Sequence, residues 1–199
     1  MSTAIAPRTG FLGKLLDRAF GHPRGALGRV GGAVMAWGNA ATERHVVEVA
    51  GVTKSETVLV VGPGPGVGLA AAAERAAKVI GVDPSEEMLA SCRARCPDAE
   101  LRNGTAAGTG QPDASVDVVV SVNNVQLWEN RATALAELHR VLRPGGRLVL
   151  SVHEQVLPVP RHQLAAEVAV AGFTDLQTWT WDAPGFGGPA AELRAAAAS

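Results

Sequence analysis

Short runs of β-branched residues alternate with helical patterns through the middle of this chain, and that alternation restricts its fold more than any other feature. The expected strands are Thr57–Val61, Lys78–Val82, Val116–Val122 and Arg147–Val152, with a weaker one near Glu100–Arg102. Helical patterns at Val67–Ala77, Ser85–Arg95 and Arg131–Leu142 separate them. Strands that alternate with helices form parallel sheets covered on both faces. We therefore expect an α/β fold with a doubly wound, mostly parallel sheet.

The residues before this alternating region predict a helical N-terminal cap. An apolar stripe runs from Phe11 to Phe20, glycines interrupt the pattern from Gly21 to Gly38, and a second helix is expected from Ala41 to Val49. After Pro160 we expect a helix over 161–171 and a strand over 173–181, while the closing alanines favour helix over strand, with a frayed end as the alternative. The sequence thus predicts one domain of 199 residues, with a cap at 1–52 and an α/β core at 53–199.

Charge, hydropathy and cysteine content exclude several classes of function. The formal net charge is −1 and no Lys/Arg run is present, so nucleic acid is not an expected partner. No apolar stretch of about 18 residues and no signal-peptide pattern occur, which predicts a cytoplasmic protein. Cys92 and Cys96 lack a second Cys/His pair that would complete a metal site, so we expect reduced structural thiols and no metal.

A glycine-rich turn, Gly62-Pro63-Gly64-Pro65-Gly66, follows the first expected strand and leads into a helix. Glycines at such a crossing allow a ligand to approach the backbone closely. The dinucleotide fingerprint GxGxxG fails here, because Val67 or Leu69 stands where the third glycine is required. The turn is therefore consistent with a nucleotide-like ligand of another kind, or with a tight connection alone.

Asp83 closes the second expected strand, about twenty residues after the glycines. A carboxylate at that point can accept hydrogen bonds from both hydroxyl groups of a ribose lying across the strand ends. Asp83 can equally cap the helix that begins at Pro84 or Ser85. The two roles are compatible, and we expect Asp83 to bind ribose.

Four motifs in order resemble one enzyme family. They are Gly62-Pro63-Gly64-Pro65-Gly66, Val82-Asp83-Pro84-Ser85 with Met88-Leu89, Asp117-Val118-Val119-Val120-Ser121-Val122-Asn123, and Leu142-Arg143-Pro144-Gly145-Gly146-Arg147. Residues 55–155 look like the type 11 branch of class I S-adenosylmethionine methyltransferases, and His22-Pro23-Arg24-Gly25 is similar to short actinobacterial members. The resemblance implies a Rossmann-like fold and S-adenosylmethionine as cofactor.

The resemblance also implies which residues contact that cofactor. By position they are Gly62, Pro63, Gly64 and Gly66 beneath the methionine portion, Asp83 at the ribose, Pro84 and Met88 beside the adenine, and Thr105 and Ala106 at the adenine amino group. Two acids typical of the family are missing, because Val60 stands two residues before the first glycine and Thr105 follows the third strand. Weaker cofactor binding is expected, and a non-catalytic relative is the alternative.

The acceptor side is expected just beyond the fourth and fifth strands. Asn123 would lie beside the sulfonium, with Gln126 and Trp128 contacting the acceptor and His153 available as a base. Three of these residues have a structural alternative: a strand-end cap for Asn123, core packing for Trp128 and a surface or capping role for His153. His139 is expected to be structural and His45 to lie on a helix surface.

The predicted function is methyl transfer to a small-molecule acceptor by in-line displacement, driven mainly by proximity. We expect the acceptor to be flat or apolar and to lie between the loop Asn123–Trp128 and a cap region around Met35 and Trp37. A nicotinamide-dependent reductase is disfavoured because GxGxxG fails and no Tyr-xxx-Lys pair occurs. The stripe Phe11–Phe20 predicts a lid, with an interfacial membrane helix as the alternative.

Overall fold

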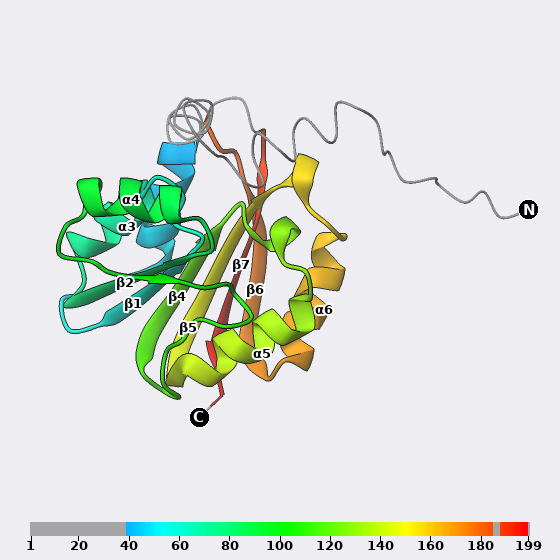
Figure 1. The fold of residues 1–199 in the computed structure, drawn as a ribbon. Coiled ribbons are helices and arrows are strands. Elements are labelled where there is room, and N and C mark those ends of the chain that lie inside the picture. Colours follow the sequence, from blue (N-terminus) through cyan, green and yellow to red (C-terminus); the bar gives the residue numbers. More distant parts are fainter. Residues whose placement is uncertain (1–38, 185–187, 199) are drawn as a thin grey trace, which may run out of the picture.

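A computed structural model, which describes residues 39–184 and 188–198, contains a seven-stranded sheet with helices on both faces (Figure 1). The strands are β1 (Thr57–Val61), β2 (Lys78–Asp83), β3 (Glu100–Asn103), β4 (Val116–Val122), β5 (Leu142–His153), β6 (Phe173–Trp181) and β7 (Ala190–Ala197). The helices are α3 (Val67–Ala73), α4 (Glu86–Arg95), α5 (Arg131–Val141) and α6 (Arg161–Val170), with short 3₁₀ turns η2 (Val125–Leu127) and η3 (Glu154–Val156). Another helix covers residues 39–50.

The sheet has the strand order β3-β2-β1-β4-β5-β7-β6. Strands β1 to β5 pair in parallel, whereas β7 runs antiparallel to β5 and β6. The predicted doubly wound, mostly parallel sheet is confirmed. From β1 the chain builds outward to β2 and β3 on one side and then to β4 and β5 on the other. The carboxyl ends of β1 and β4 therefore form a topological switch point, where ligands of α/β proteins bind.

Alternating side chains of the strands fill two apolar layers, one on each face of the sheet. In β1, Val58 and Val60 pack beneath residues 39–50 and α3, while Leu59 and Val61 join the layer beneath α5 and α6. Figure 1 shows α3 and α4 over one part of the sheet and α5 and α6 over the other. Each buried Val or Leu contributes about 1.5–3 kcal/mol. The alternation of side chains along β1 thus provides an apolar surface for helices on each face of the sheet.

The expected helix at the closing alanines is wrong, because these residues form strand β7. Alanine has the highest intrinsic helix propensity, but β7 is paired with a strand on each side and most of its residues are buried. The start of β5 also differs from the expectation. Pro144, Gly145 and Gly146 were expected to end a helix before the strand, yet β5 already begins at Leu142, which pairs with Val116 ahead of a register shift.

Much of the predicted cap lies outside the described residues. This applies to the stripe Phe11–Phe20 and to Met35 and Trp37, so the lid, the membrane alternative and the single-domain division stay predictions. The second predicted helix is present and covers residues 39–50. None of the helices in 39–184 and 188–198 is both long and apolar enough to cross a bilayer.

Arg147 fastens the end of the helix at 39–50 to the sheet. Its guanidinium forms two bonds with Glu56, at 2.7 and 3.0 Å, and also donates to the backbone carbonyls of Ala50 and Gly51. Both side chains are largely buried. These bonds to Arg147 lower the pKa of Glu56 from 4.5 to about 2. The ion pair therefore holds in place the helix that lies above the switch point.

We expect Glu56→Gln to lower the free energy of unfolding by about 1–3 kcal/mol at pH 7. A carboxyl whose pKa is lowered by folding stabilises the protein above its unfolded pKa, and this contribution is lost as the pH falls from about 4.5 towards 2. Urea denaturation should therefore show a clearly larger difference between variant and wild type at pH 7 than at pH 3, and the difference should vanish only near pH 2. Glu48→Gln, whose side chain is 60% exposed, is the control and should change little. An equal loss at both pH values would contradict the assignment.

Candidate active site

The glycine turn lies at the carboxyl end of β1 and is held by its neighbours. Gly62 and Gly66 have φ angles of +65° and +88°, and a Cβ on Gly62 would overlap the side-chain amide of Asn124. From α4, Cys92 Sγ donates to the Gly64 carbonyl and Arg95 Nε donates to Pro65. In the part of the chain that the structure describes, no atom beyond the two chain neighbours lies within 4 Å of an ideal Cβ on Gly64. The turn thus presents open backbone at Gly64, which fits the approach of a cofactor.

Asp83 lies beside this turn, at the end of β2, and is only 7% exposed. The backbone N–H of Ser85 donates to its Oδ1 at 2.9 Å, and the Gly62 N–H donates to the carbonyl of Val82. Burial raises the pKa of Asp83, and the N–H groups of Ser85 and Gly64 partly oppose that rise. A desolvated carboxylate with hydroxyl donors brought to it would be stabilised in its charged form. The structure therefore brings the glycine turn and Asp83 together as the sequence predicts.

The residues predicted to contact adenine lie in the segments after β2 and after β3, next to Asp83. Met88 is buried in α4, whose first turn is capped by Ser85, while Pro84 is exposed. Gly104 N–H donates to the Asp83 carbonyl, which places the loop after β3 against the same strand end. In that loop Thr105 is exposed and Ala106 is buried. All these predicted positions lie along one edge of the sheet, and their contacts with adenine stay predictions.

The residues predicted on the acceptor side form hydrogen bonds with one another and with the neighbouring residues Asn39 and Asn124. Asn123 donates from Nδ2 to Asn39 at 3.1 Å and accepts the backbone N–H of His153 at 2.8 Å. Gln126 donates to the Asn123 carbonyl, and Trp128 Nε1 donates to Asn124. Trp128 also packs against the core. These contacts favour the strand-end cap for Asn123 and the packing role for Trp128. The contacts of these residues with an acceptor stay predictions.

Unlike the amides of Asn123 and Gln126 and the indole of Trp128, the imidazole of His153 can act as a base, and one of its ring nitrogens has no partner among the described residues. The side chain is 7% exposed, and its Nδ1 lies 3.0 Å from the carbonyl of Gly188. A carbonyl only accepts, so Nδ1 carries the proton and Nε2 of the neutral ring holds a lone pair. Nε2 is buried and has no hydrogen-bond partner among the described residues. His153 therefore has the tautomer that a proton acceptor needs.

A second histidine corrects an expectation. His45 was expected on a helix surface, but its Nε2 lies 3.1 Å from Glu192, which is fully buried, and its ring stacks on Trp181. Ser151 donates to the other oxygen of Glu192. These contacts join the helix at 39–50 to β5 and β7. These contacts could not be predicted from the sequence, because Glu192 belongs to a segment for which helix was favoured. His139 does pack edge-on against Phe173, so its structural role is confirmed.

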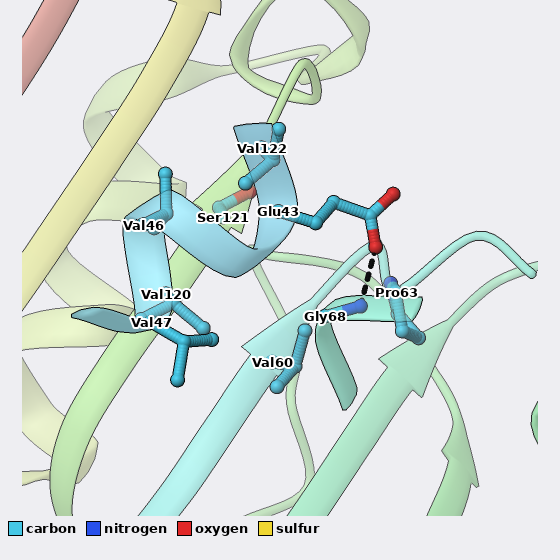
Figure 2. A pocket seen from close by; sticks show the side chains of 10 residues that line it. Glu43, Val46, Val47, Val60, Pro63, Gly68, Val120, Ser121 and Val122 are labelled. Carbon is cyan, nitrogen blue, oxygen red and sulfur yellow. Dashed lines mark hydrogen bonds between the residues drawn. The ribbon is translucent and has the colours of Figure 1, made fainter. Parts of the chain in front are cut away.

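A small cavity beneath the glycine turn contains a carboxylate that the sequence interpretation missed (Figure 2). Its lining residues are Glu43, Val46, Val47, Val60, Gly62, Pro63, Gly68, Val120, Ser121 and Val122. Glu43 accepts the backbone N–H of Gly68 at 2.5 Å. Burial raises its pKa from 4.5 to about 7. The sequence signal for this residue was indirect: Val60 stands where an acid is expected, so a carboxylate from elsewhere in the chain could replace it.

Comparison with known proteins agrees with this geometry. The family described as "Methyltransferase domain" matches residues 59–150. A probable S-adenosylmethionine-dependent methyltransferase of Mycolicibacterium smegmatis is 42% identical over 100 residues, which are 50% of this chain and 38% of that protein. A trans-aconitate 2-methyltransferase of Methylobacterium radiotolerans is 37% identical over 111 residues, which are 56% of this chain and 42% of that protein.

Among solved structures, the fold resembles a Burkholderia thailandensis 1,6-didemethyltoxoflavin-N1-methyltransferase with a TM-score of 0.67 and 20% identity, over 82% of this chain and 81% of that one. The similarity to the methyltransferase family covers residues 59–150, a little less than half of this chain. The chain spans about two fifths of the length of the two curated relatives.

Proposed function

We propose that this protein transfers the methyl group of S-adenosylmethionine to a small-molecule acceptor. The observation that carries the proposal is the pairing of an open glycine turn with the buried carboxylate of Asp83 at adjoining strand ends. When bound, S-adenosylmethionine supplies an activated methyl group, so holding the acceptor in line can provide much of the acceleration. The match of residues 59–150 to the methyltransferase family and the similarity to two methyltransferases support the proposal.

The surroundings of the strand ends favour an acceptor with an apolar surface. Leu127 follows β4 and is 53% exposed, and Val156 follows β5 and is 46% exposed. Both belong to short 3₁₀ turns next to the positions of Asn123 and His153. Exposed apolar side chains beside a ligand site support binding of an apolar partner. Where the acceptor must lose a proton, the free Nε2 of His153 would receive it.

Direct measurement of cofactor binding and product formation tests this function. We expect S-adenosylmethionine to bind in calorimetric titration, and mass spectrometry of the purified protein to detect retained cofactor or its demethylated product. Incubation with flat, apolar acceptors bearing hydroxyl or amino groups should release S-adenosylhomocysteine. Cofactor binding without any product would favour the non-catalytic alternative, and no binding of either compound would overturn the proposal.

A further inference from the structure

The carboxylate of Glu43, from the helix at 39–50, lies against the start of α3, just after the glycine turn. One oxygen accepts the N–H of Gly68 at 2.5 Å, and Figure 2 shows the second oxygen turned away from Gly68. A Cβ on Gly68 would lie 3.2 Å from Cβ of Glu43, so glycine allows this close contact. The side chain therefore reaches the turn along a path that a larger residue at position 68 would obstruct.

Among the described residues, the cavity around this carboxylate has no positive charge at bonding distance. Val60, Val120 and Val122 line it with methyl groups, and Ser121 uses its hydroxyl to donate to Val61. Glu43 forms no ion pair with any described residue. A partly buried carboxylate with no cationic partner among the described residues is unfavourable, and a cationic group placed in the cavity would relieve the cost. The chemistry of the cavity thus suits a ligand that carries an ammonium group.

Val60 and Glu43 occupy complementary positions in this cavity. Val60 belongs to β1 and cannot accept a hydrogen bond, whereas Glu43 approaches the same space from the helix above (Figure 2). We propose that Glu43 supplies from the N-terminal helix the carboxylate that β1 lacks, and that it binds the ammonium group of the cofactor's methionine portion. This inference rests on the proposed function, because it assumes that S-adenosylmethionine occupies the turn.

The electrostatic surroundings predict how binding responds to pH. Arg95 of α4 and Arg44 of its own helix act on Glu43 at longer range and lower its pKa, but burial dominates and the pKa is raised to about 7. Cys92 and Asp83 face the same region, and their own pKa values are raised mainly by burial. A bound ammonium would favour the charged form of Glu43. Below pH 7, binding should therefore release a proton and weaken as the pH falls, by at most about tenfold per pH unit for one proton.

The first test compares ligands with and without the ammonium group. Glu43→Gln should weaken S-adenosylmethionine and S-adenosylhomocysteine about 5- to 50-fold in calorimetric titration, because a charged hydrogen bond is lost. Methylthioadenosine, which lacks the amino-acid portion, should bind wild type and variant equally. Titrations from pH 6 to 8 should show the loss of affinity at low pH in wild type and not in the variant. Glu48→Gln, an exposed acid on the same helix, is the matched control.

The second test moves the carboxylate back to the strand. Adding Val60→Glu to Glu43→Gln places one acid in the same cavity, and it should restore most of the lost affinity for S-adenosylmethionine. If Glu43→Gln alone folds poorly, a folded double variant still shows whether one carboxylate in this cavity is enough for cofactor binding. Wild type that binds no cofactor would overturn the proposed function. If wild type binds the cofactor and a folded Glu43→Gln has the same affinity for all three ligands at every pH, the role of Glu43 is overturned and the proposed function stands.

Discussion

Replacing His153 with glutamine is expected to lower the turnover of methyl transfer about 10²–10⁴-fold for an acceptor that must lose a proton. The reason is the bond from Nδ1 to the Gly188 carbonyl, which leaves the lone pair on the buried Nε2. Glutamine retains hydrogen bonding but is not a base at neutral pH. The measurement is S-adenosylhomocysteine production at saturating cofactor, together with calorimetric titration of S-adenosylmethionine, whose affinity should not change.

A comparison of acceptors adds a readout that a structural role would not affect. The loss in His153→Gln should appear in turnover for an acceptor that must lose a proton, and it should be absent for an acceptor that has no proton to lose. His162→Gln, on the exposed side of α6, is the control and should match wild type. A folded His153→Gln with full turnover would show that proximity alone drives the reaction and that His153 only ties β5 to the segment at Gly188.

Elements with a strong local pattern could be predicted from the sequence. The β-branched runs at β1, β2 and β4 bury both faces, and no other element suits such short apolar segments between helices. The glycine turn and Asp83 were also predictable as neighbours. Parallel strands that flank a switch point end at the same edge, so residues that follow β1 and β2 must meet there.

Contacts between distant segments could not be predicted in this way. Strand β7 depends on partners on both sides, and its alanines carry no strand signal of their own. The pair His45 and Glu192 joins positions 147 residues apart. Glu43 was missed for the same reason, because a polar residue on a helix gives no information about the surface that it meets until the helix is placed.

Glu43 also changes what the missing acid at Val60 means. The sequence alone suggests that Val60→Glu would tighten cofactor binding by restoring a carboxylate. In the folded protein that new acid would lie in a small cavity beside Glu43. Two carboxylates so close together repel each other, and one would be held protonated. Val60→Glu by itself is therefore expected to bring little gain, in contrast to its effect when Glu43 is neutralised.

Replacing Asp83 with asparagine is expected to weaken S-adenosylmethionine binding about 5- to 150-fold, which corresponds to about 1–3 kcal/mol. Asparagine has nearly the same shape and still accepts the Ser85 N–H, so the turn into α4 is preserved. The charge that would accept the ribose hydroxyls is lost. Because burial raises the pKa of Asp83, the charged form is unfavourable without ligand, and the variant should unfold at an equal or higher urea concentration.

Weaker binding combined with undiminished stability is the signature of a carboxylate kept for a ligand and not for the fold. Calorimetric titration and urea denaturation of the same preparation measure both quantities. Asp98→Asn, an exposed acid after α4, is the control for the loss of one negative charge and should bind like wild type. Methylthioadenosine, which retains the ribose, should lose as much affinity as S-adenosylmethionine does. If Asp83→Asn instead lost stability and kept its affinity for both ligands, Asp83 would be a helix cap and the ribose would lie elsewhere.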